Sequence, residues 1–223
     1  MPRRKKSTSN VKFHSKRLAR NASRKADPVR NRHLYSFTKV LEEHFGDSCT
    51  TLVGAEVGVY LGQFSEGLLE RFPHLLLYLV DPYPLDTANW GDFLSRAKLD
   101  WKPENMTSVK ESAAERLQRF VDAKRAVWVY AGAHEVSMDM FLDLNFAFLD
   151  HNHSLAAMRR DLPIWWEGIR SGGLLAGHDW KEGQVRWGVT RAVTEFAAKL
   201  GLPIETTTGK VWVVKKPQTY ASP

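Results

Sequence analysis

The sequence has little of what several protein classes require. A single cysteine, Cys49, excludes an intrachain disulfide framework and a zinc site built from cysteines. Strictly apolar runs such as Leu75–Val80 fall far short of the roughly 20 residues that a membrane-spanning helix needs. No apolar stretch near Met1 has the character of a secretory signal. These absences predict a protein of a reducing, intracellular compartment, cytoplasmic by default.

Acidic residues are nearly absent from the first 32 residues. This segment contains 12 Lys and Arg residues against one acid, Asp27, so its formal charge is +11. The whole chain carries +7, which leaves −4 for residues 33–223. Because residues 1–32 also contain few large apolar side chains, they cannot bury much surface. We expect a basic, disordered arm at 1–32 and one folded domain at 33–223.

The basic arm has several interpretations. The cluster Pro2–Lys6 is typical of nuclear import or nucleic-acid contact, and the whole arm is also similar in composition to an organelle transit peptide. Attachment to RNA or to an anionic membrane by charge is a third interpretation, and an extension without function is a fourth. Phe13 is the only Phe, Tyr or Trp in the arm, so we do not expect it to read bases by stacking.

From residue 33 onward, helical and strand patterns alternate. Apolar residues at helical spacing predict helices at 33–45, 62–72, 108–123, 154–170 and 185–200. Apolar and β-branched runs predict strands at 51–59, 75–80, 126–130, 145–149, 174–176, 203–205 and 210–215. This order predicts an α/β fold: a Rossmann-like, doubly wound, mostly parallel seven-stranded sheet that ends in an antiparallel hairpin.

Two features are expected to interrupt these elements. Pro163 is expected to kink or split the helix at 154–170, and Gly172-Gly173 are expected to form a turn before the strand at 174–176. Residues 82–106 have no regular pattern and contain Trp90 and Trp101. Such an inserted loop could form a lid or a pocket for a substrate.

Polar residues follow the predicted strands, at the edge where sheets of this kind bind ligands. These residues are Glu56, Gly58, Asp81, Gly132–His134, Asp150-His151 and Gly177–Asp179. Gly58 and Gly62 lie between a strand and a helix, where a tight turn lets a ligand approach the backbone. Their spacing differs from the G-x-G-x-x-G of dinucleotide-binding folds. Turn glycines and a helix-capping aspartate explain the same residues without a ligand.

Several of these motifs resemble a known family. The runs Gly54–Gly62 and Leu79–Tyr83 are similar to the first two motifs of class I S-adenosylmethionine-dependent methyltransferases. The later motifs resemble the small-molecule O-methyltransferase-like group called methyltransferase family 24; they are Phe148–Ser154, Asp161–Trp166, Gly172–Trp180 and Thr208–Pro217. The resemblance covers about residues 34–217. It implies a Rossmann-like fold and S-adenosyl-L-methionine as the cofactor.

The resemblance implies a set of cofactor-binding residues: Glu56, Gly58, Tyr60, Gly62, Asp81, Ala133, His134 and Asp150. Glu56 and the two glycines would surround the methionine part, Asp81 would hold the ribose, and Ala133 and His134 would lie beside the adenine. Related enzymes often have a serine or another small polar residue where His134 stands. Asp150 would face the methyl sulfonium, a cation that suits carboxylates and the aromatic walls that Tyr60, Tyr83 and Trp180 could provide.

Methyl transfer to a hydroxyl requires in-line alignment and the removal of a proton. His178 or His153 could act as the general base, because an imidazole titrates near neutral pH. Alternatively, magnesium or manganese held by Asp150 and Asp179 could lower the pKa of the acceptor, as the resemblance to catechol O-methyltransferase-like enzymes implies. Trp180 stands where those enzymes have an asparagine as a third ligand. The histidines could also serve only to shape loops by hydrogen bonding.

The sequence therefore predicts an S-adenosylmethionine-dependent methyltransferase that transfers a methyl group to a hydroxyl of a small molecule. Two alternatives involve the basic arm at 1–32. The first is methylation of RNA or of a protein that the arm holds near the site. The second is a non-catalytic RNA-associated protein with the same fold. The carboxylates Glu56, Asp81, Asp150 and Asp179 argue against the second alternative, because a site without turnover has no physical need for them.

Overall fold

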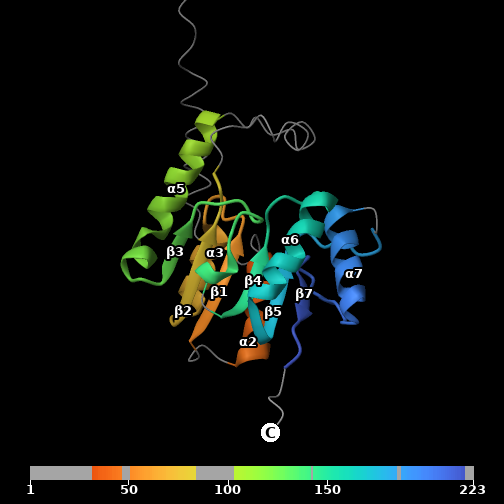
Figure 1. Cartoon of the computed structure of the whole chain (residues 1–223). Helices are drawn as coiled ribbons and strands as arrows, with labels where there is room; N and C mark the ends of the chain where they lie inside the picture. The colour runs from red at the N-terminus through yellow and green to blue at the C-terminus, as the bar shows by residue number, and fades with distance from the viewer. Residues whose placement is uncertain (1–31, 47–50, 84–102, 142, 185–186, 219–223) are drawn as a thin grey trace, which may run out of the picture.

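The computed structural model describes residues 32–46, 51–83, 103–141, 143–184 and 187–218. In this part of the chain, helices lie on both faces of one seven-stranded sheet (Figure 1). The expectations for the basic arm and for Cys49, Trp90 and Trp101 lie outside the described residues. None of the described helices is long and apolar enough to cross a membrane.

Helices and strands alternate as the sequence predicts. They are α2 Arg32–Phe45, β1 Leu52–Val57, α3 Gln63–Arg71, β2 Leu75–Val80, α5 Pro103–Asp122, β3 Ala126–Val129, the 3-10 turn Met138–Met140, β4 Leu144–Leu149, α6 Leu155–Gly168, β5 Ile169–Gly177, α7 Gly188–Leu200, β6 Glu205–Thr206 and β7 Trp212–Lys215. Ser154 caps α6, since its side chain accepts a hydrogen bond from the Ala157 amide, and Gly201 ends α7 in a left-handed conformation.

The strand order is β3-β2-β1-β4-β5-β7-β6. The first five strands of this order are parallel to one another, and β7 is antiparallel to β5 and to β6. The predicted fold class is therefore confirmed, including the closing hairpin. The direction of winding reverses between β1 and β4, and ligands bind beyond the carboxyl ends of the strands at such a point.

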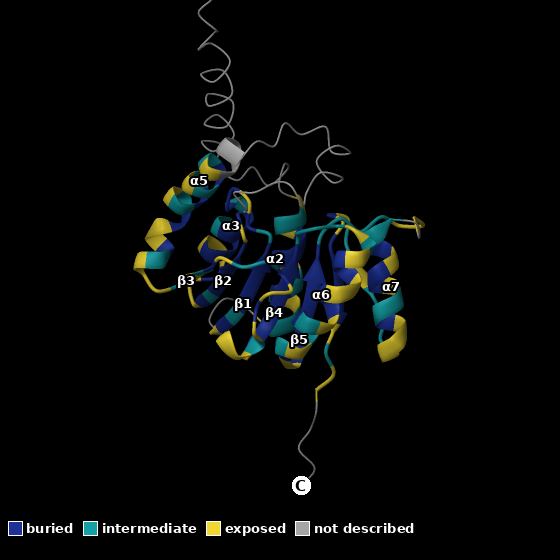
Figure 2. Ribbon diagram, turned by 45° about the horizontal axis from the view of Figure 1, so that its top comes forward, coloured by how far each residue is buried: buried dark blue, intermediate teal, exposed yellow. Residues whose placement is uncertain are grey.

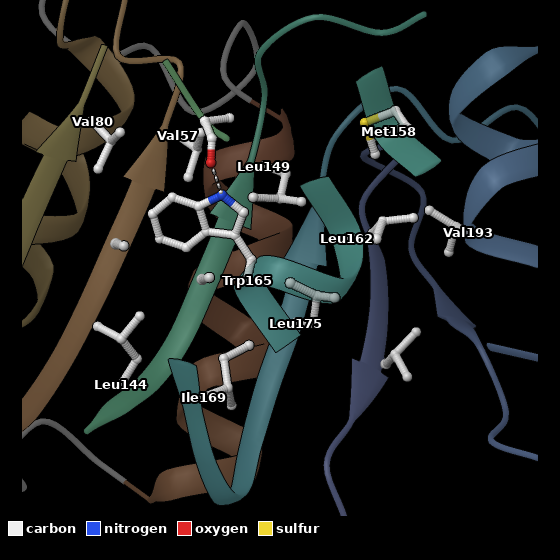
Figure 3. Packing of buried hydrophobic residues seen from close by; sticks show 14 of the residues in the cluster. Val57, Val80, Leu144, Leu149, Met158, Leu162, Trp165, Ile169, Leu175 and Val193 are labelled. Atoms are coloured by element: carbon white, nitrogen blue, oxygen red, sulfur yellow. Dashed lines mark hydrogen bonds between the residues drawn. The ribbon is translucent and has the colours of Figure 1, made fainter. Parts of the chain in front are cut away.

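The core has two layers, because alternate residues of a strand point to opposite faces. In β2, Tyr78 and Val80 pack in the layer formed with α6 and α7, whereas Leu77 and Leu79 pack in the layer formed with α2, α3 and α5. Figure 2 shows buried strands between helices whose outer faces are exposed. In the first layer, the fully buried Trp165 donates its indole N–H to the Ala133 carbonyl at 3.0 Å (Figure 3).

The two expected interruptions behave differently in the structure. Pro163 lies inside α6, and the helix continues through it without a split. β5 begins at Ile169, earlier than the predicted residue 174, and the expected turn lies within it: Gly172 has a φ of +73°, and a Cβ on Gly173 would lie 2.5 Å from the Ile169 side chain, so the chain bends back on itself here. A Cβ on Gly173 would lie 2.7 Å from the Asn145 carbonyl oxygen, so glycine at this position permits the close approach of β5 to β4. In addition, α5 begins at Pro103, earlier than the predicted residue 108, since proline is well tolerated in a first helical turn.

Candidate active site

The turn after β1 brings two strand ends into close contact. Gly58 has a φ of +95°, and its amide donates a hydrogen bond to the Val80 carbonyl at 2.8 Å. A Cβ on Gly58 would lie 2.3 Å from the Asp150 carbonyl oxygen, so the backbone permits only glycine here without a shift. Gly62, also left-handed with a φ of +71°, then starts α3. Gly58 therefore permits the close approach of the end of β1 to the end of β4, whereas Gly62 lets α3 pack against Leu117 of α5.

Glu56 is a buried acid at the end of β1, with 2% of its surface exposed. Its carboxylate accepts a hydrogen bond from the Ser65 hydroxyl of α3. Burial raises the pKa of Glu56 well above its usual range; the hydrogen bond from Ser65 opposes this shift, and the negative charges of Asp150 and Asp81 add to it. Three strands thus place their acids close enough to interact: Glu56 from β1, Asp81 after β2 and Asp150 after β4.

Asp81 follows β2 directly and is held by backbone amides. The Tyr60 amide donates to one of its oxygens at 3.0 Å, and the Tyr83 amide donates to the other at 2.9 Å. The Tyr83 hydroxyl in turn donates to the Tyr60 carbonyl at 2.7 Å, which joins the two turns. Burial raises the pKa of Asp81, although these amide hydrogen bonds oppose the shift. The orientation of this carboxylate is therefore fixed before any ligand arrives.

Four side chains from the ends of β4 and β5 form one cluster. His153 lies between two aspartates: its Nε2 is 3.2 Å from Asp150 Oδ1, and its Nδ1 is 3.4 Å from Asp179 Oδ2. His178 approaches the same two carboxylates through Nδ1 alone, at 3.7 Å from an oxygen of each. The structure thus brings together all four residues that the sequence marks as catalytic candidates. We call Asp150, His153, His178 and Asp179 the acid–histidine cluster.

The charges within this cluster stabilise one another. Burial disfavours the ionised form of Asp150, but the hydrogen bond from His153 and the nearby imidazole of His178 prevail and lower its pKa below the usual range. Burial likewise disfavours the charged form of His178, but Asp150 and Asp179 prevail and raise its pKa above 6.5. The cluster therefore holds an ionised carboxylate beside an imidazole whose pKa is raised above its usual value.

The sequence gives no sign of a further histidine at this site. His33, the second residue of α2, has its ring centroid 4.5 Å from that of His178 and 5.2 Å from that of Phe64. Burial and the positive charge of His178 lower the pKa of His33 to about 4, although Asp150 and Asp179 oppose the shift. No motif identifies His33 as a site residue. Helical spacing predicts that His33 belongs to a helix, but it does not predict where that helix packs on the sheet.

The remaining candidates differ in how far they are exposed. Ala133 is buried and His134 is exposed, and both follow the edge strand β3. Tyr60 is 44% exposed, whereas Tyr83 is buried. Trp180 is half-buried, and its indole N–H donates to Glu182 at 2.9 Å.

His151 pairs with helix α6 and not with the cluster. Its Nε2 lies 2.8 Å from Oδ2 of the fully buried Asp161, which also accepts from Arg160 at 2.6 Å. Among the described residues, Nδ1 of His151 has no hydrogen-bond partner. The contact with Asp161 agrees with the interpretation that His151 shapes the loop after β4.

The residues present fit the cofactor that the motifs imply better than they fit a metal. S-adenosylmethionine carries positive charge at its sulfonium and at its ammonium; Asp150 offers an ionised carboxylate to such a ligand, and a bound cation would favour the ionised forms of Glu56 and Asp81, whose pKa values are raised without it. For a metal, no group of three or more His, Cys, Asp or Glu side chains in the described part of the chain has a suitable arrangement. Asp150 and Asp179 are paired with histidine nitrogens instead.

Solved structures share this fold at low sequence identity. An O-methyltransferase family protein from Burkholderia thailandensis matches with a TM-score of 0.55 and 11% identity, over 85% of this chain and 58% of its own. The N-methyltransferase NodS from Bradyrhizobium japonicum gives 0.54 and 13%, over 87% and 100% of the two chains. The O-methyltransferase NovP gives 0.57 and 15%, over 83% and 80%. The names of these proteins give different acceptor atoms, oxygen or nitrogen. The shared fold therefore does not identify the acceptor atom for this chain.

The sequence itself matches a family model. The model describes a methyltransferase domain and matches residues 55–180, more than half of the chain, from β1 to the residue after Asp179. No curated protein matches the chain by sequence. The matched region contains Glu56, Asp81 and the whole acid–histidine cluster, and the family implies S-adenosyl-L-methionine as the methyl donor. The chain therefore belongs to methyltransferase family 24.

Proposed function

We propose that this methyltransferase transfers the methyl group of S-adenosyl-L-methionine to a hydroxyl of a small molecule, with His178 as the general base. The observation that carries this proposal is the contact of His178 with Asp150 and Asp179, in which only Nδ1 faces the carboxylates. An imidazole oriented through one nitrogen has its other nitrogen available to take a proton from a substrate.

The buried acids support binding of the cofactor. Glu56, near the turn at Gly58, would hold the ammonium of the methionine part, and the fixed carboxylate of Asp81 would accept hydrogen bonds from the ribose hydroxyls. Asp150, at the reversal of strand order, would face the sulfonium. The cofactor supplies the electrophilic methyl group, and the chain supplies orientation and charge.

The cluster supports a hydroxyl acceptor, because a hydroxyl must lose its proton when it attacks carbon. His178 Nε2 would take that proton, while Asp150 and Asp179 would stabilise the imidazolium that forms. His153, held at both ring nitrogens by the same aspartates, would keep the two carboxylates in place. The side chains of the cluster are 21–26% exposed, which suits a small acceptor that reaches into a largely covered site.

Binding and turnover test this proposal separately. Titration of S-adenosylhomocysteine into the full chain should show micromolar or tighter binding by calorimetry, with no change on addition of magnesium, manganese or a chelator. Transfer of radiolabelled methyl groups to phenols and sugars should then occur and should be lost in His178→Gln. The matched control is His74→Gln, since His74 is exposed before β2, at the opposite edge of the sheet. Absence of binding under all conditions would contradict the proposal.

A second candidate function is methylation of a polyanion such as RNA. One observation favours it: α2 begins at Arg32, next to His33, whose ring contacts that of His178, so the basic sequence of residues 1–31 joins the described fold at the site. Counterion release would then make binding weaken steeply with salt. Replacement of Arg3, Arg4, Lys5 and Lys6 by glutamine should reduce RNA binding and its salt dependence. Unchanged RNA binding in that variant would remove this candidate.

A further inference from the structure

The acid–histidine cluster is covered by a helix that lies outside the region matching the family model. α2 ends at Phe45, before the match begins at residue 55. At its far end, the His44 Nε2 lies 2.8 Å from the Gly172 carbonyl oxygen, beside the early part of β5. In its first turn, the ring of His33 contacts the ring of His178, the residue that directly follows β5. The helix therefore begins at the site with its first turn and runs along the sheet towards the amino ends of the strands, where Figure 1 shows its end below β5.

The ring of His33 contacts two aromatic rings at once. Its plane lies 11° from that of Phe64, with centroids 5.2 Å apart, which is a stacked arrangement. Its plane lies 37° from that of His178, with centroids 4.5 Å apart. Phe64 belongs to the first turn of α3 and stacks in turn on Phe148 of β4, with centroids 4.3 Å apart. A continuous set of rings thus connects the buried core to His178.

We propose that His33 is a positioning residue for the methyl-transfer reaction: its ring, supported by Phe64, holds the His178 imidazole against Asp150 and Asp179. This inference rests on the proposed function, in which His178 is the general base. The distances of 3.7 Å between His178 Nδ1 and both carboxylates are long for hydrogen bonds, so these contacts alone orient the ring weakly. The ring of His33, with its centroid 4.5 Å from that of His178, supplies a further constraint.

The charge state of His33 suits this role. With its pKa lowered to about 4, His33 is neutral at pH 7 and places no second positive charge beside His178. The groups that act on His178 are Asp150 and Asp179, which favour its charged form, and Lys210, which disfavours it. A neutral ring face beside an imidazolium is a favourable contact, and a phenylalanine ring would provide the same face.

Histidine ring signals in the full-length protein test the proposal without turnover. Ring ¹H and ¹³C signals of His178, assigned by comparison with His178→Gln, should shift in His33→Ala because the ring current of His33 is removed. They should stay close to the wild-type positions in His33→Phe. Tyr35→Ala is the control on the same helix, since Tyr35 is 56% exposed and should leave the His178 signals unchanged. Unchanged signals in a folded His33→Ala would overturn the proposal.

Kinetics provide the second measurement, with radiolabelled S-adenosylmethionine and catechol as the probes. In His33→Ala, kcat should fall about tenfold while the KM for S-adenosylmethionine changes little, because misplacement of a base affects the transfer step. His33→Phe should recover most of this loss. Equal loss in both variants would overturn the proposal, because it would show that a His33 nitrogen acts directly. If the wild type neither binds the cofactor nor transfers methyl groups, the proposed function fails, while the ring signals still decide the placement of His33.

Discussion

His178 Nδ1 lies 3.7 Å from Asp150 Oδ1, although the two residues follow different strands of the sheet. The contact exists because β4 and β5 are parallel neighbours, with Leu149 paired to Gly177 in the sheet register. Both strands therefore end at the same level, and the residues that follow them face one another. This relationship joins two separate motifs and provides the contact between the proposed general base and a carboxylate.

The first prediction concerns the cofactor. Asp81→Ala should weaken the binding of S-adenosylhomocysteine by about 1–3 kcal/mol, because a charged hydrogen-bond acceptor is lost. Calorimetric titration measures this change. The matched control is Asp122→Ala, which removes an exposed carboxylate at the end of α5, near the amino ends of the strands. Equal affinity in the Asp81 variant and the wild type would refute the ribose-binding role of Asp81.

The second prediction separates catalysis from binding. Asp179→Asn should lower kcat by about 100-fold or more, in the range of losses for an impaired general base, with cofactor affinity nearly unchanged. Asparagine is preferable to alanine here because Asp179 has a φ of +60°, a conformation that asparagine adopts more readily. Full activity in this variant would show that Asp179 does not support His178.

The third prediction concerns pH. His178 must be neutral to take a proton, and its pKa is raised above 6.5, so activity should fall as the pH decreases through this raised value. Asp150→Asn removes a negative charge that stabilises the imidazolium, so the pKa of His178 should move down. NMR titration of the His178 ring in the wild type and in the variant measures both values. An upward shift of the His178 pKa in Asp150→Asn, or no shift, would contradict the contact between His178 and Asp150.

The fourth prediction concerns the fold around the site. Gly58→Ala should lower the free energy of unfolding by about 2–5 kcal/mol, since it combines a positive φ with a Cβ placed 2.3 Å from the Asp150 carbonyl oxygen. Gly46→Ala is the control for the backbone effect alone, because Gly46 has a φ of +86° with nothing within 4 Å of its Cβ. Its cost should be about 1–2 kcal/mol. Chemical denaturation measures the free energy of unfolding of both variants. Equal losses would show that the backbone at Gly58 can move away from Asp150 without an energetic penalty.

Local patterns predict most of the secondary structure, and they fail where tertiary contacts override them. The continuous apolar run of β2 matches its prediction from Leu75 to Val80, because a strand buried on both faces has a distinctive sequence. Gly172 and Gly173 favour a turn, and the chain turns there, but no local pattern shows that Ile169 already pairs with Leu144 of β4 before this turn. Pro163 is tolerated inside α6.

The boundaries of the domain and the role of the basic arm stay predictions. The described fold begins at Arg32, and the expectations for residues 1–31 are tested by the salt dependence and charge replacement described above. The intracellular compartment, expected from the cysteine content and the basic arm, likewise stays a prediction.

The sequence by itself determined the alternation of strands and helices, the acids at the strand ends and the family, because periodicity and short motifs are local properties of a chain. Only the tertiary structure decided which of these residues meet. Parallel pairing of β4 with β5 joins Asp150 to His178, and the packing of α2 brings His33 to the same place. Such contacts depend on how whole helices and strands pack against one another, so they cannot be inferred from the spacing of residues along the sequence.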